Sequence, residues 1–198
     1  FVEQEFRPED LVQQIVDQYP DTSTKIIFAP SLPWEGEMFQ RPQQLARALA
    51  REGALVFYMQ PERSWPPRFQ EMEDRLFICS TPADAFQVIP EAFVYTLTWS
   101  VPLLAFFDSP RVIYDYLDDL SVFQGDRLRL QRDHDDTLQS ADLVLVTSRK
   151  LYQEAGVLRE DLLLCPNAAD YDHFHQLPEG PAPEDLQPIL DRGQPVVG

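Results

Sequence analysis

The chain has 198 residues and is 44% hydrophobic, which is enough for one good core, or for one core and an appendage. A formal net charge of -17 argues against nucleic acid or an anionic membrane as partner, because phosphates attract basic protein faces. No run reaches the ~20 apolar residues of a membrane span, and Phe1 opens no signal sequence. Cys79 and Cys165 sit in apolar runs without metal-ligand spacing, which predicts free thiols and a cytoplasmic protein.

Short apolar runs rich in β-forming residues recur along the chain and alternate with helical patterns. The runs that we expect to be strands are 25–29, 54–59, 75–79, 93–98, 111–116, 143–146 and 162–165. Crossover-sized segments separate these runs, as in parallel sheets. The sequence therefore predicts an α/β fold with a Rossmann-like, mainly parallel sheet flanked by helices.

The helical patterns fall between and before these runs. We expect helices in Phe1–Asp21, from Arg41-Pro42 to Gly53, in 101–107, in 126–140, and from the cap Ser148 to Gly156. Prolines crowd the last part of the chain, as in linkers. The predicted organisation is a peripheral helix in 1–24, a Rossmann-like domain in 25–175, and a linker with the start of a further domain in 176–198.

Several catalytic and cofactor motifs are missing from the sequence. No glycine-rich phosphate loop follows a predicted strand, and no Gly-x-Ser-x-Gly nucleophile elbow occurs. The triplets Asp133-His134-Asp135 and Asp170-Tyr171-Asp172 fit a metal pattern, but such triplets arise freely in an acidic chain. We therefore expect no metal and no cofactor in this chain.

The order of several motifs is more specific than any one of them. Trp34-x-Gly36-x-x-Phe39-Gln40-Arg41-Pro42 follows the first expected strand, and Tyr114-Asp-Tyr-Leu-Asp-Asp119, Ser140-Ala-Asp142, Val146-Thr-Ser148 and Pro166-Asn-Ala-Ala-Asp170 come later in that order. Over residues 25–174 this combination resembles the amino-terminal domain of GT-B glycosyltransferases of the family-4-like type, near teichuronic acid and capsule synthesis enzymes. The family more often has Asn-Gly-Val-Asp where this chain has Asn167-Ala-Ala-Asp170.

The resemblance implies two Rossmann-like halves that face each other across a cleft. It makes this chain the acceptor side of a sugar-nucleotide-dependent enzyme of surface polysaccharide or glycolipid synthesis, with a carbohydrate or a lipid-linked acceptor. The sugar nucleotide would bind mainly to the other half, so this chain alone is expected to be inactive. Two alternatives stay open: a non-catalytic carbohydrate- or partner-binding module, and a GT-B epimerase of nucleotide sugars.

Glycosyl transfer needs carboxylates or dipoles near the anomeric carbon and a group that orients the acceptor hydroxyl. Asp118 and Asp119 follow an expected strand, and we predict that one of them binds acceptor hydroxyls or acts as a base. His134 is a third catalytic candidate. The alternative for both aspartates is a role without catalysis: they cap a helix near Ser121 or are simply exposed to solvent.

The expected substrate-binding residues lie in loops at the carboxyl edge of the sheet. Trp34 and Phe39 offer flat surfaces for sugar rings, and Arg41 a contact for a phosphate or carboxylate. The other candidates are Gly36, Gln40, Asp115 and Asn167. Some of these candidates also have a structural alternative. Trp34 and Phe39 would pack their loop on its own domain, Arg41 would form an ion pair at the start of a helix, and Asn167 would shape its loop. The loops 32–43 and 115–121 should be neighbours in space.

Overall fold

The computed structural model describes residues 7–193 except 37, 63, 172–174, 176–179 and 182–183. The chain divides into two compact units, Phe1–Asn167 and Ala168–Gly198. The first unit carries the sheet and all the residues discussed as a site below. The boundary at Asn167 therefore marks where the chain leaves the folded body that is described next.

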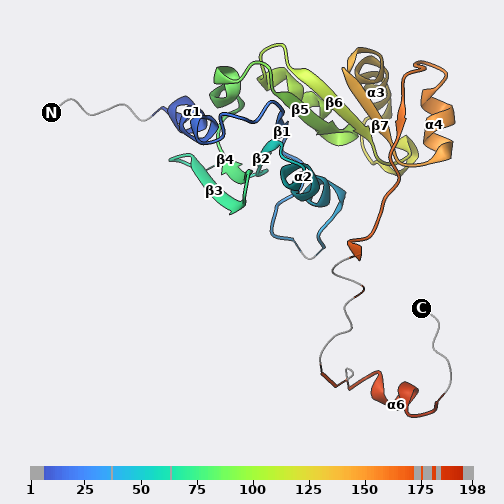
Figure 1. Ribbon diagram of the computed structural model, residues 1–198. Helices are drawn as coiled ribbons and strands as arrows, with labels where there is room; N and C mark the ends of the chain where they lie inside the picture. The colour runs from blue at the N-terminus through green and yellow to red at the C-terminus, as the bar shows by residue number, and fades with distance from the viewer. Residues whose placement is uncertain are drawn as a thin grey trace. The chain divides into compact units, whose positions relative to one another are not determined.

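The first unit contains an eight-stranded sheet with the order β3-β4-β2-β1-β5-β6-β7-β8 (Figure 1). The strands are β1 Lys25–Phe28, β2 Leu55–Met59, β3 Arg68–Glu73, β4 Leu76–Ser80, β5 Phe93–Leu97, β6 Arg111–Tyr116, β7 Leu143–Val146 and β8 Leu163–Leu164. Every strand pair except β3 with β4 is parallel. Each run expected to form a strand does so, which confirms the predicted Rossmann-like α/β fold.

Strand β3 was not among the strands expected from the sequence. It pairs antiparallel with β4 at the edge of the sheet, and its register shifts between Glu71 and Glu73. Most of its side chains are exposed, so it lacks the apolar run that identifies a buried strand. A short, charged and irregular strand is a common way to protect a sheet edge from pairing with another chain.

Helices cover both faces of the sheet. On one face lie α1 Pro8–Gln18, the 3-10 helices η1 Ala83–Val88 and η2 Thr98–Phe106, α3 Arg127–Ser140 and α4 Arg149–Ala155. The other face packs against α2 Arg41–Arg51. A further 3-10 helix, η3 Leu120–Val122, follows β6. We call the face under α2 the α2 face, and it contains the candidate site.

The helix predictions hold in most details. Helix α1 ends at Gln18, before Pro20, and buries Val12 and Ile15 against the core. Helix α2 has its proline in the first turn, as expected. The expected helix in 101–107 is instead part of a 3-10 helix, because Pro102 lies inside it and has no N–H to donate to an α-helical ladder.

Ser148 is expected to be a stabilising cap. Its Oγ accepts a hydrogen bond from the backbone N–H of Leu151 at 3.3 Å. Ser148→Ala removes that acceptor, so we expect the free energy of unfolding to fall by about 1 kcal/mol. Urea denaturation followed by circular dichroism measures this loss. Gln153→Ala, an exposed change in α4, is the matched control and should shift stability by less than about 0.5 kcal/mol.

The second unit is described only in part. It contains a four-residue helix, α6 Gln187–Leu190, and a stacked pair of rings, Tyr171 and His175, whose centroids are 4.7 Å apart. Part of the segment 176–198, predicted to be a linker and the start of a further domain, lies outside the described residues. None of the helices in the described part of the chain is both long enough and apolar enough to cross a lipid bilayer.

Candidate functional site

The parallel strands all point the same way, so their carboxyl ends form one edge of the sheet (Figure 1). Loops leave this edge after β1, β5, β6 and β8, and they carry most of the residues expected from the sequence. Open α/β sheets bind their ligands at this edge, because loops from several strands converge there. The site is therefore assembled from segments that lie far apart in the sequence.

The centre of this edge is a buried ion pair between Arg41 and Asp115. The Nε and Nη2 atoms of Arg41 donate to the two carboxylate oxygens of Asp115 at 2.7 and 3.3 Å. The Tyr95 hydroxyl donates to the same carboxylate at 2.5 Å, and Nη1 of Arg41 donates to Oδ1 of Asn167 at 3.2 Å. We call these four residues the Arg41 cluster. It joins the start of α2 to β5, β6 and the end of the first unit.

Within the Arg41 cluster, the side chains of Arg41, Asp115 and Tyr95 are largely buried, and burial changes the pKa values of two of them. The side chains of Arg41 and Asp115 are only 9% and 0% exposed. Desolvation lowers the pKa of Arg41, but the hydrogen bonds and charge of Asp115 outweigh it, and the net pKa is raised. Burial, and then the charge of Asp115, raise the pKa of Tyr95 well above its usual range. At neutral pH Arg41 is therefore a cation and Tyr95 a neutral phenol.

Trp34, predicted to stack on sugars, lies in the core. It is 8% exposed and packs edge-to-face on Tyr58 and Phe39, with ring centroids 5.1 Å apart in each pair. Its backbone N–H donates to Gln60. Phe39 is 38% exposed and so keeps part of its surface at the edge. Trp34 therefore positions the loop after β1, and Phe39 is the ring of this pair that solvent reaches.

Gln43 holds the loop after β1 in place, although it was not predicted as a site residue. Its side chain is buried, accepts from the backbone N–H of Gln40 at 3.1 Å and donates to the Pro33 carbonyl at 3.1 Å. Gln40 itself is exposed and caps α2. Gly36 is exposed as well, and a Cβ there would meet only two backbone oxygens, at 3.8 and 3.9 Å, so packing does not require a glycine.

The neighbouring aspartates differ in their surroundings. Asp119 Oδ1 accepts from the Ser121 backbone N–H at 2.8 Å, and Oδ2 pairs with Lys150. The hydrogen bond from Lys150 and those from Ser121 lower the pKa of Asp119. Asp118 is exposed, and no described residue forms a hydrogen bond or ion pair with its side chain. Asp119 therefore caps η3, whereas Asp118 faces solvent at the carboxyl edge.

His134 lies on the face of the sheet opposite to the Arg41 cluster. Its Nδ1 is 2.7 Å from the Tyr114 hydroxyl, and its ring lies 4.4 Å from that of Tyr116. Tyr114 and Tyr116 flank Asp115 in β6, and adjacent strand residues point to opposite faces. The structure therefore separates His134 from Arg41 and Asp115, with which it was expected to share a site.

The buried imidazole makes stability depend on pH. Burial lowers the pKa of His134, although the charges of Asp135 and Glu154 act against this shift. The stability contributed by the neutral ring is complete above the unfolded pKa of about 6.5, and it is lost as the pH falls through the lower folded pKa. His134→Asn keeps an acceptor for Tyr114 and does not titrate, so we expect a flatter stability profile below about pH 6.5. The midpoint of urea denaturation, measured at several pH values, gives the stability profile of each variant. His175→Asn is the control.

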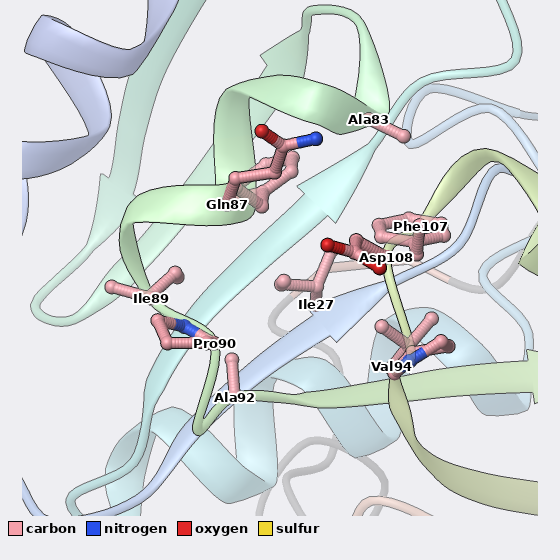
Figure 2. A pocket seen from close by; sticks show the side chains of 11 residues that line it. Ile27, Ala83, Gln87, Ile89, Pro90, Ala92, Val94, Phe107 and Asp108 are labelled. Carbon is pink, nitrogen blue, oxygen red and sulfur yellow. The ribbon is translucent and has the colours of Figure 1, made fainter.

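The cavity drawn in Figure 2 lies elsewhere in the fold. It has a volume of about 70 Å³ and is bounded by η1 and by residues at the start of β5 and β6, among them Pro90, Ala92 and Pro110. Ile27 and Val94 place it on the face opposite α2. Small-molecule sites usually measure about 300–1,000 Å³, so this cavity is too small for a ligand of that class. Within the described residues, no three His, Cys, Asp or Glu side chains gather as metal ligands would.

The fold belongs to the Rossmann-like α/β class, and one solved structure shares it. The chain is similar to a sucrose-phosphate synthase from Thermosynechococcus elongatus, with 16% identity, a TM-score of 0.51, and coverage of 85% of this chain and 52% of that one. A shorter form of that synthase gives 16% identity, a TM-score of 0.48, and coverage of 76% and 91%. The first likeness shows that the two chains share a fold. The chain thus spans about half the length of that full synthase.

The sequence itself gives no further assignment. It matches no protein-family model and no curated protein.

Proposed function

We propose that this chain is the acceptor-binding part of a sugar-nucleotide-dependent glycosyltransferase. The observation that carries the proposal is the Arg41 cluster, which joins the start of α2 to β5, to β6 and to the segment after β8 at the carboxyl edge of the sheet. The glycosyltransferase-like fold supports the same assignment. The donor would bind chiefly to a second domain, and the acceptor would be a carbohydrate or a lipid-linked carbohydrate of a surface polymer or glycolipid made in the cytoplasm.

The experiment compares the full-length protein with this chain alone. The full-length protein is incubated with radiolabelled UDP- and GDP-sugars and a mixture of glycoside acceptors, and products are separated from donors. We expect transfer by the full-length protein, and neither transfer nor micromolar binding of a sugar nucleotide by residues 1–198, because this sequence has no glycine-rich phosphate loop. Tight donor binding by the short chain would contradict the acceptor assignment.

The alternative of a non-catalytic carbohydrate-binding module predicts a different result. The full-length protein would then bind glycosides without transferring or hydrolysing any donor sugar. An epimerase would instead convert the donor sugar to its stereoisomer with no acceptor present. Chromatography of the donor pool after incubation separates these three outcomes in one assay.

A further inference from the structure

Two aromatic side chains at the carboxyl edge were not predicted as site residues. Trp99 comes directly after β5, and Phe123 lies in the loop after β6. Their ring centroids are 5.6 Å apart and the ring planes meet at 45°. Both side chains are half-buried, so each keeps part of its ring at the surface. We call this tilted pair of rings the aromatic wedge.

The aromatic wedge lies beside the Arg41 cluster. Trp99 packs against the core of the α2 face, which is also the face on which Asp115 lies. Leu97, two residues before Trp99, is the register partner of Asp115 across β5 and β6. Phe123 belongs to the same loop as the exposed Asp118. The loop after β6 therefore carries both a half-buried ring of the wedge and, five residues before it, an exposed carboxylate.

Buried hydrogen bonds fix the position of Trp99. Its two neighbours, Thr98 and Ser100, are each only 1% exposed. Thr98 Oγ1 lies 2.9 Å from the Tyr114 hydroxyl, and Ser100 Oγ accepts from the Leu97 backbone N–H at 3.0 Å. These bonds hold the backbone on both sides of Trp99. Its ring is held by packing against the core of the α2 face and against Phe123, so Trp99 is a preorganised surface.

We propose that the aromatic wedge binds the ring of the acceptor sugar and so determines acceptor specificity. One face of a pyranose ring carries C–H groups that pack on an aromatic ring, while its edge carries hydroxyls that need polar partners. Trp99 and Phe123 supply the first kind of surface, and Asp118 supplies an acceptor of the second kind. This inference rests on the proposed function, because it names the substrate contact of that same edge.

The test measures sugar binding directly. Saturation-transfer NMR of the full-length protein uses methyl glycosides of glucose, galactose and mannose as probes. We expect saturation of ring C–H protons of at least one probe, and Trp99→Ala should raise its dissociation constant by roughly tenfold. Trp99→Phe and Phe123→Leu should have smaller effects and guard against a folding defect. Trp65→Ala, at a 76% exposed tryptophan between β2 and β3, is the control and should bind as the native protein does.

The outcomes separate this inference from the proposed function. Absence of binding by every probe, or equal binding by Trp99→Ala and the native protein, overturns the aromatic wedge. If glycosides bind through Trp99 but no sugar is transferred, the wedge stands and the transferase proposal fails. If sugar is transferred and Trp99→Ala leaves KM for the acceptor unchanged, the transferase proposal stands and the wedge fails.

Discussion

Asp115→Ala is expected to lower the free energy of unfolding by about 3–5 kcal/mol, the usual cost of removing one partner from a buried ion pair. The guanidinium of Arg41 and the hydroxyl of Tyr95 both donate to this carboxylate, and the side chain of Asp115 is 0% exposed. The substitution leaves Nε and Nη2 of Arg41 and the hydroxyl of Tyr95 without their acceptor in the interior. Urea denaturation followed by circular dichroism gives the change.

A double-mutant cycle attributes this loss to the pair. Arg41→Met removes the charge that Asp115→Ala leaves unpaired, so the double variant should be more stable than the sum of the single changes predicts. Glu91→Ala is the control, because its partner Lys25 is 2.7 Å away but Glu91 is 51% exposed. An exposed pair contributes no more than about 1 kcal/mol. Equal losses for Glu91→Ala and Asp115→Ala would mean that burial does not strengthen the pair.

Much of the fold follows from local sequence. The predicted parallel strands are confirmed because each is a compact apolar run, and burial on both faces of a parallel sheet selects for such runs. The end of α4 at Gly156 and its cap Ser148 are confirmed as well. Strand β3 could not be predicted, because its exposed residues carry no apolar periodicity and only the neighbouring β4 makes them a strand.

The sequence predicted which loops lie at the candidate site, but it did not predict every contact between their side chains. The expected proximity of the loops 32–43 and 115–121 is confirmed by the bond from Arg41 to Asp115. That bond is also the ion pair weighed as the structural alternative for Arg41. Tyr95 was missed because it lies inside an apolar run, where a phenol is indistinguishable from a packing residue. Only the register of β5 with β6 reveals that its hydroxyl meets Asp115.

Other contacts depend on which way a side chain points, and a loop sequence does not specify that. Trp34 points into the core and Phe39 reaches solvent, although the motif presents them alike. His134 could be separated from Asp115 only once α3 was known to pack on Tyr114 and Tyr116. The roles of Asp118 and Asp119 in catalysis stay predictions, and their different surroundings now give these two residues different tests.

Asp118→Asn is expected to lower kcat/KM of the full-length protein for sugar transfer on the order of 100-fold, the lower range for a positioned acid–base group. The side chain is exposed, and no described residue forms a hydrogen bond or ion pair with it, so stability should change by less than about 0.5 kcal/mol. Initial rates at several acceptor concentrations, with thermal melting of the same sample, give both quantities.

Asp119→Asn is the matched control, one residue further along the same loop. It weakens the ion pair with Lys150 and leaves an oxygen that can still cap Ser121, so it should lower thermal stability more than Asp118→Asn does. Its effect on turnover should be the smaller of the two, because its carboxylate is already engaged within the protein. The opposite result would be an inactive Asp119→Asn variant and a fully active Asp118→Asn variant. It would identify Asp119, which pairs with Lys150, as the reacting carboxylate.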